Sequence, residues 1–183
     1  MAIVLPKQVW TEEGKLLFQK SEKVTDFNQT RKIVKSLKET LERYGGVGLA
    51  APQIGISQRV FVVNISPNNK YHPDLPKIGF RAYLNPEILA VSSETNYDTE
   101  GCLSIFYGTL YGQIERGNFV KLKYLDTNGE EKKEEISHSF HTRVVLHEND
   151  HLEGKIFLQR MEPEDFSELS WNENLDIRKK DSR

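Results

Sequence analysis

Two histidines and a glutamate form the motif of this sequence that is best suited to chemistry. His147-Glu148-Asn149-Asp150-His151 follows the pattern H-E-x-x-H. Imidazoles four residues apart share one face of an α-helix, so His147 and His151 can bind a single metal ion. Glu148 could take a proton from a water molecule at the open side of that ion. The motif therefore predicts a metal-dependent hydrolase.

A catalytic metal site usually has three protein ligands and one open position, so a third ligand is needed. A metzincin site would require histidine where this chain has Phe157. A thermolysin-like endopeptidase would use a downstream glutamate, and Glu168 and Glu173 stand at workable separations in a predicted C-terminal helix. The remaining candidate is Cys102, whose thiolate is a soft ligand suited to Zn²⁺ or Fe²⁺. Spacing alone leaves glutamate and cysteine both open.

Three sequence blocks together resemble the peptide deformylase family. They read GVGLAAPQ at 46–53, EGCLS at 100–104 and HENDHLEG at 147–154, and they occur in the family's order. The resemblance implies a hydrolase of protein biosynthesis that removes the formyl group from the N-terminal formyl-methionine of nascent polypeptides and releases formate. The alternative is an H-E-x-x-H metallopeptidase with a downstream glutamate as its third ligand.

The resemblance also implies a metal centre. Cys102, His147 and His151 would bind one divalent metal ion, with Fe²⁺ as the native ion and Zn²⁺ or another divalent ion as the alternative. Glu148 would act as general base and then as general acid.

Further residues would handle the substrate. By the same resemblance, Gln53 and the backbone N–H of Leu103 would stabilise the oxyanion. The formylated peptide would lie extended against Val47, Gly48 and Gly101, in the manner of an added strand.

Some positions depart from the family pattern. Phe106 stands where proline is common, and the stretch Ile105–Glu115 is longer than usual. Leu146 replaces a frequent glutamine, and Asn149 is unusual within the histidine motif. These departures concern substrate preference and the wall beside the cysteine more than the type of reaction.

The elements that must position these residues are helices and mainly antiparallel strands. Hydrophobic spacing and turn residues predict helices over about 28–44 and 139–152, strands over 59–65 and 82–91, a hairpin over about 120–136 and a surface loop over 67–76. Pro86 places its strand near a sheet edge or a bulge. Gly154 is expected to end the second helix. Strands gathered around a central helix that carries H-E-x-x-H indicate an α+β fold of the peptide deformylase type.

Length predicts a single catalytic domain over 1–183, with a core over about 1–165 and a C-terminal helix or tail over 166–183. The net charge of −2 gives no global field for sequence-specific nucleic-acid binding. No run approaches the ~18 apolar residues of a membrane span, and the single cysteine favours a reducing compartment, the cytoplasm. The basic tail, from Arg178 to Arg183, suggests contact with the ribosome as a second partner besides formylated nascent peptides.

Overall fold

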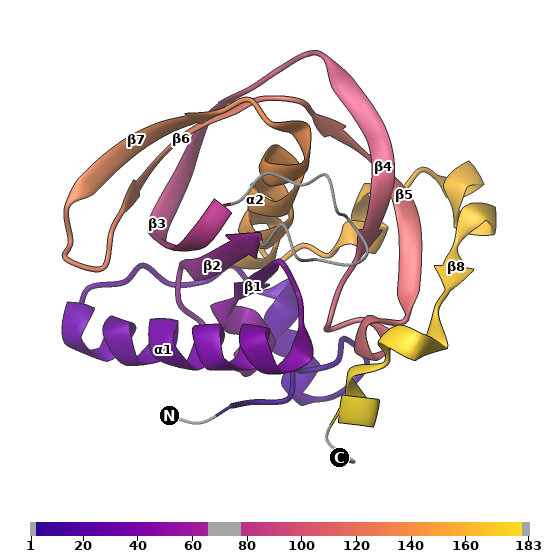
Figure 1. Ribbon diagram of the computed structural model, residues 1–183, viewed down its shortest axis with the longest axis horizontal. Coiled ribbons are helices and arrows are strands. Elements are labelled where there is room, and N and C mark those ends of the chain that lie inside the picture. The colour runs from indigo at the N-terminus through magenta and orange to yellow at the C-terminus, as the bar shows by residue number, and fades with distance from the viewer. Residues whose placement is uncertain (1–2, 66–77, 181–183) are drawn as a thin grey trace.

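Two antiparallel sheets and a central helix make up the computed structural model, which describes residues 3–65 and 78–180 (Figure 1). The larger sheet has the strand order β1-β2-β3-β6-β7 and the smaller sheet the order β4-β5-β8. Helix α2 stands between the two sheets, and α1 lies along the bottom of the larger one (Figure 1). The predicted α+β architecture is confirmed.

The described residues form the α-helices α1 (Phe27–Tyr44) and α2 (Ser139–Leu152). The strands are β1 (Gly48–Ala50), β2 (Val60–Ile65), β3 (Ile78–Val91), β4 (Thr95–Gly101), β5 (Leu110–Gly117), β6 (Val120–Leu125), β7 (Glu131–Ile136) and β8 (Ser170–Trp171). The 3-10 helices are η1 (Glu13–Phe18), η2 (Ala51–Ile54), η3 (Phe106–Gly108), η4 (Phe157–Arg160), η5 (Pro163–Glu168), η6 (Glu173–Leu175) and η7 (Ile177–Lys180).

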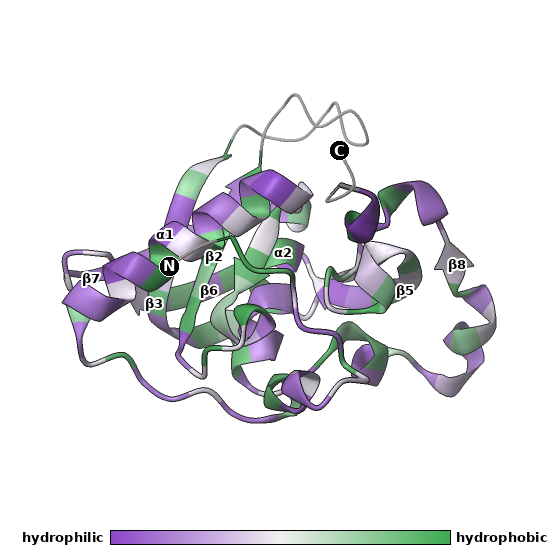
Figure 2. Cartoon of the chain, turned by 90° about the horizontal axis from the view of Figure 1, so that it is seen from below, coloured by the Kyte–Doolittle hydropathy of each residue, from purple (hydrophilic) through white to green (hydrophobic). Residues whose placement is uncertain are grey.

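Helix α1 forms where its caps and its apolar stripe agree. The Asp26 side chain accepts hydrogen bonds from two N–H groups of the first turn, and Gly45, with φ of 82°, ends the helix. Ile33, Leu37 and Leu41 are buried in one core cluster with residues of β1 and β2. In Figure 2, α1 is striped with hydrophilic and hydrophobic residues, whereas β2 is mostly hydrophobic. The helix therefore covers one face of the larger sheet.

Pro86 lies at a bulge in the middle of the larger sheet. Strand β3 runs between β2 and β6, and its register with β6 shifts between Leu84 and Glu87. Proline has no N–H to donate to the ladder, and the bulge removes the need for one. The prediction of an edge or a bulge is confirmed by the bulge, which lies in a central strand.

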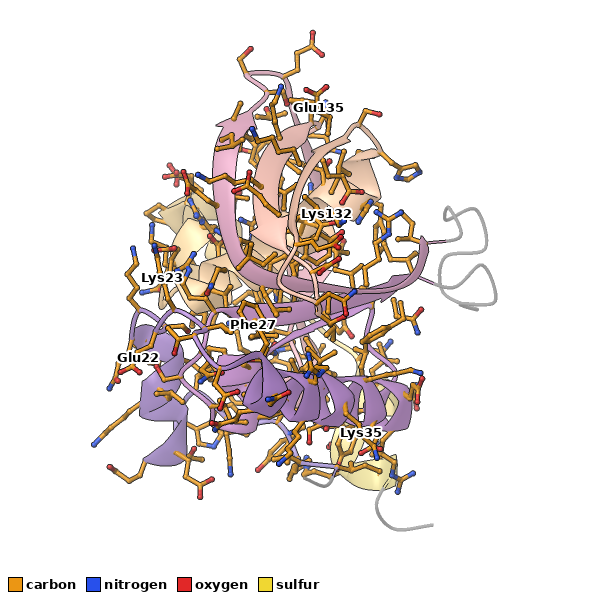
Figure 3. All side chains as sticks on the ribbon, turned by 90° about the vertical axis from the view of Figure 1, so that its left-hand side faces the viewer. Glu22, Lys23, Phe27, Lys35, Lys132 and Glu135 are labelled. Carbon is orange, nitrogen blue, oxygen red and sulfur yellow. The ribbon has the colours of Figure 1, made fainter. Side chains whose placement is uncertain are left out.

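The predicted hairpin is confirmed as β6 and β7. The Asp126 side chain accepts hydrogen bonds from two N–H groups of the turn, and Gly129 has φ of 86°. A Cβ on Gly129 would lie 3.3 Å from the ring of Phe27 in α1, so the turn rests on the start of that helix. Figure 3 looks onto this side, with Lys132 and Glu135 of β7 above α1.

The C-terminal segment does not form the predicted α-helix. Its described residues make η5, the two-residue strand β8 on the edge of β5, η6 and η7. The Asn172 side chain accepts a hydrogen bond from the N–H of Asn174, and such local bonds favour turns over a helix. The loop predicted over 67–76 lies outside the described residues. Among the residues that the structure describes, no helix is long and apolar enough to cross a membrane.

Gly154 provides a test of how α2 ends. It has φ of +72°, and a Cβ on it would lie 2.8 Å from a backbone carbon of Phe18. We expect Gly154→Ala to lower the free energy of unfolding by about 2 kcal/mol, because it adds left-handed strain and a backbone clash. The control is Gly79→Ala, since a Cβ there has no heavy atom within 4 Å and the change should stay within about 0.5 kcal/mol. Urea unfolding of both variants in the same metal state measures the loss in the free energy of unfolding. Equal losses in the two variants would contradict the prediction.

Candidate active site

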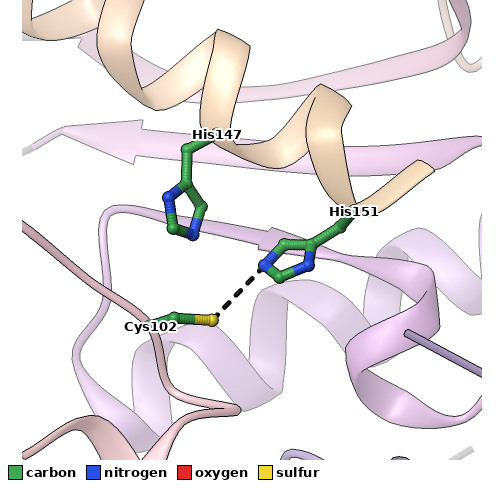
Figure 4. A group of neighbouring side chains, drawn as sticks. All are labelled: Cys102, His147 and His151. Carbon is green, nitrogen blue, oxygen red and sulfur yellow. Dashed lines mark hydrogen bonds between the residues drawn. The ribbon is translucent and has the colours of Figure 1, made fainter. Parts of the chain in front are cut away.

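Helix α2 points two histidines at the cysteine that follows β4 (Figure 4). The ligand atoms of Cys102, His147 and His151 lie within 4.8 Å of one another, and all three residues are buried. The Cys102 Sγ atom is 3.3 Å from Nε2 of His151. Two ligands of a tetrahedral zinc ion lie about 3.5 Å apart. The group therefore has the donors and the spacing to hold one metal ion.

The competing third ligands are not part of this group. Glu168 and Glu173 are both exposed. Their segment lies beside β8, and β5 separates β8 from β4, which leads into Cys102. The structure thus favours the cysteine over a downstream glutamate.

The surroundings of the two histidines shift their pKa values in opposite directions. Burial, followed by the charge of His147, lowers the pKa of His151 to about 3, so this imidazole is neutral at neutral pH, as a metal ligand must be. Burial also acts to lower the pKa of His147, but hydrogen bonds to Cys102 and Glu100 raise it overall. The Nδ1 atom of His147 lies 2.8 Å from Glu100 Oε2, which leaves its Nε2 for a metal.

Glu100 anchors His147 within a buried ionic network. It accepts hydrogen bonds from Arg116 at 2.8 and 3.0 Å and from Arg143 at 2.9 Å. Burial acts to raise the pKa of Glu100, but the bonds from His147 and Arg116 lower it well below its ordinary value. The carboxylate therefore stabilises the fold at neutral pH, and this contribution is lost as the pH falls through the lowered pKa.

A second carboxylate extends the network. Asp150 accepts hydrogen bonds from Arg116 at 2.6 Å and from Arg160 at 3.0 Å. The sequence analysis missed the roles of both arginines and of Arg143. Two signals could have found Arg116 and Arg143: alternate residues of β5 are buried and include Arg116, and Arg143 stands four residues before His147 on α2.

Glu148 is buried beside β1. Burial raises its pKa to about 7, and its Oε2 atom has no hydrogen-bond partner among the described residues. A Cβ on Gly48 would lie 2.5 Å from Glu148 Oε1, so only glycine leaves room for this carboxylate. The positive charge of a bound metal ion would lower this pKa and favour the ionised form.

Gln53 is held in one orientation. Its Oε1 atom accepts a hydrogen bond from the N–H of Ala50 at 2.8 Å. Its Nε2 atom therefore faces the other way and donates to Cys102 Sγ at 3.4 Å and to Ser104 Oγ at 3.3 Å. The side chain is 2 % exposed, so a buried amide N–H group lies directly beside the predicted metal ligand.

A residue that the sequence analysis did not identify, Gln8, ties down the turn after Cys102. Its Nε2 atom donates to the carbonyl of Leu103 at 2.9 Å, and its Oε1 atom accepts from the N–H of Tyr107 at 2.9 Å. Gln8 is buried, and no sequence pattern links it to a turn some 95 residues away. The position of the Leu103 peptide group thus depends on the N-terminal segment.

The three predicted peptide-binding positions lie on or next to outer strands. Val47 precedes β1 and Gly48 begins it, and β1 is an outer strand of the larger sheet. Gly101 ends β4, an outer strand of the smaller sheet, immediately before Cys102. Each outer strand leaves one row of backbone groups for an added strand.

Known protein sequences are similar to this chain over most of its length. Residues 6–167 match the family described as polypeptide deformylase. A peptide deformylase of Thermotoga maritima is 39% identical over 149 residues, which cover 81% of this chain and 82% of the relative. One of Chlorobium phaeobacteroides is 37% identical over 163 residues, which cover 89% of this chain and 82% of the relative.

Solved structures of peptide deformylases are also similar to this chain. The crystal structure of class I type b peptide deformylase from Acinetobacter baumannii bound to Met-Ala-Ser is similar with a TM-score of 0.78 and 38% identity. The match covers 88% of this chain and all of the other. The structure from Thermotoga maritima matches with a TM-score of 0.74 and 37% identity, over 87% of this chain and 99% of the other.

The bond between Glu100 and His147 can be tested through metal affinity. We expect Glu100→Gln to weaken metal binding about 10- to 100-fold, because the amide no longer orients His147 as an anion does. The measurement is a competition titration of Zn²⁺ against a chromogenic chelator. Glu135→Gln, which changes a carboxylate in an exposed ion pair with Lys121, is the matched control. Equal affinities in the two variants would show that the Glu100 anion does not support the site.

Proposed function

The chain belongs to the polypeptide deformylase family, and on that premise we propose that Cys102, His147 and His151 hold the metal ion of its reaction. The enzyme removes the N-formyl group from nascent polypeptides. The observation that carries this assignment is the buried group itself, whose thiolate and two imidazoles approach one point between α2 and the end of β4. The donor set is one that Fe²⁺ and Zn²⁺ both accept.

Glu148 is the proposed proton carrier. When bound, the metal ion supplies a Lewis acid that makes a water molecule more acidic and polarises the formyl carbonyl. Glu148 takes a proton from the attacking water as the water oxygen bonds to the formyl carbon. The carbon–nitrogen bond then breaks, Glu148 gives the proton to the leaving amine, and formate remains. Its unpartnered Oε2 atom and the space left by Gly48 support this role.

Gln53 and the N–H of Leu103 are the proposed donors to the formyl oxygen as negative charge develops there. A single donor of this kind is worth about 3 to 4 kcal/mol in the transition state. The bond from Ala50 to Gln53 Oε1 supports this role because it turns the amide N–H group toward Cys102. The clamp of Gln8 on the Leu103 carbonyl supports the second donor by fixing the turn.

For the substrate, we propose an extended peptide between the outer strands β1 and β4. Val47, Gly48 and Gly101 would pair with its backbone. The similar enzyme from Acinetobacter baumannii has been solved with Met-Ala-Ser bound, which supports a site that holds at least three residues.

The finer properties of the metal and the surroundings are proposals too. We propose Fe²⁺ as the native ion, and elemental analysis of protein purified without oxygen would decide between it and Zn²⁺. The proposed compartment is the cytoplasm, where formylated chains would meet the enzyme and where fractionation would locate it. Contact of the basic tail with the ribosome is supported by the exposed Lys179. Unchanged ribosome pelleting of Lys179→Glu would remove that last proposal.

Formate release from formyl-Met-Ala-Ser tests the catalytic assignment. We expect Glu148→Gln to lower kcat by about 100-fold or more with its metal retained, because general acid–base catalysis is lost. Cys102→Ala should lose the metal as well as activity. Glu135→Gln serves as the exposed carboxylate control. A fully loaded wild-type protein that releases no formate would refute the reaction, and a Glu148→Gln variant with normal kcat would refute the role of Glu148.

A further inference from the structure

Three exposed aromatic side chains form a continuous surface, which we call the aromatic platform: Trp10, Phe106 and Trp171. Trp10 is 48% exposed, Phe106 is 43% exposed and Trp171 is 59% exposed. The ring centroids of Trp10 and Phe106 lie 4.6 Å apart, and those of Phe106 and Trp171 lie 4.9 Å apart. Contiguous exposed apolar groups of this kind mark binding surfaces.

The three rings of the platform come from segments that are far apart in the chain. Phe106 lies in η3, soon after Cys102. Trp171 lies in β8, beyond residue 167, where the match to the family ends. Strand β8 pairs with Leu110 and Tyr111 of β5, and this pairing brings Trp171 to Phe106.

The turn that presents Phe106 is strained and firmly held. Phe106 and Tyr107 have φ of 44° and 56°, in a region that side chains with a Cβ rarely adopt. Gln8 binds the N–H of Tyr107, and a Cβ on Gly108 would lie 3.9 Å from the fully buried Ile177 of the C-terminal segment. Such strain persists only where the surrounding contacts determine the conformation, and it is common at binding sites.

The platform is continuous with the peptide-binding edge of the site. The N–H of Ile105 donates to the carbonyl of Cys102 at 3.0 Å, so Phe106 stands one tight turn from the proposed metal ligand. The Leu103 side chain lies between the segment before β1 and the turn that holds Phe106, because a Cβ on Gly46 and one on Gly108 would each lie 3.3 Å from it. An extended peptide advances about 3.3 Å per residue. A residue two or three positions beyond the formylated methionine would therefore lie about 7 to 10 Å along the peptide from it.

We propose that the aromatic platform binds an apolar or aromatic side chain of the nascent peptide, two or three residues beyond the formylated methionine, and so selects among substrates. This inference rests on the proposed function and goes beyond it by naming a preference. The occupant is an apolar peptide because the three rings carry no charge. The nearest cation, Arg178, stacks on Tyr107 and is paired with Asp176, which leaves little charge for an anionic partner such as RNA.

Intrinsic fluorescence measures occupancy directly, because the only two tryptophans of the chain, Trp10 and Trp171, both belong to the platform. The metal-loaded Glu148→Gln variant is titrated with formyl-Met-Ala-Phe-Ala, formyl-Met-Ala-Ala-Phe and formyl-Met-Ala-Ala-Ala. At least one phenylalanine peptide should bind about 3- to 10-fold tighter than the alanine peptide and shift the emission. Equal affinities would overturn the proposal. So would an equal emission change with N-acetyl-phenylalanine amide, which lacks the formylated end.

Phe106→Gly is the sharpest variant, because glycine adopts φ of 44° without strain and the turn is kept while the ring is removed. In this variant the preference should disappear. Phe166→Ala, an exposed aromatic residue that takes no part in the ring contacts of the platform, should keep it. A preference that survives Phe106→Gly would overturn the proposal even if the variant is fully folded and loaded.

The outcome is separable from that of the proposed function. Formate release by the wild type from the alanine peptide tests the reaction, whereas the titrations need no turnover. Release with equal affinities leaves deformylation standing and overturns the platform. Tighter binding of a phenylalanine peptide supports the platform whatever the rate of release.

Discussion

The hydrogen bond between His147 and Glu100 is the interaction on which the rest of the site depends. It joins the helix that carries two of the proposed metal ligands to the strand that leads into the third. Glu100 in turn is held by Arg116 of β5 and Arg143 of α2, so one carboxylate links three elements. A buried charge of this kind is tolerated only with its partners in place, and removal of one partner commonly costs about 3–5 kcal/mol. The geometry of the metal group and the packing of α2 between the sheets are therefore determined together.

Space is the second constraint. Glu148 fits beside β1 only because Gly48 has no side chain, and one of its carboxylate oxygens has no hydrogen-bond partner in the part of the chain that the structure describes. The cost of burying an unpartnered carboxylate is offset when a cation binds next to it. The site is thus organised for an ion: a neutral His151, an oriented His147, a cysteine sulfur beside the amide of Gln53 and a carboxylate that gains from nearby positive charge.

The surface next to the site lies outside the three sequence blocks that resemble the family. The proposed ligands and donors all lie within those blocks. The strained turn at Phe106 and Tyr107 requires support from Gln8 and from the C-terminal segment, neither of which belongs to those blocks. Variation in the outer wall is compatible with unchanged chemistry because the proposed peptide contact lies away from the reacting bond.

By itself, the sequence determined the local and chemical features: helices over about 28–44 and 139–152, the β6–β7 hairpin, an edge or a bulge at Pro86, and the histidine pair on one helical face. These follow from spacing, capping and turn chemistry, which act within a few residues. Only the tertiary structure decided that Cys102 rather than Glu168 or Glu173 approaches the histidines, and that Arg116, Arg143 and Gln8 support the site. It also replaced the expected C-terminal helix with a strand on β5. Such contacts join residues far apart in the chain, and their energy depends on burial and on partners that no local pattern specifies.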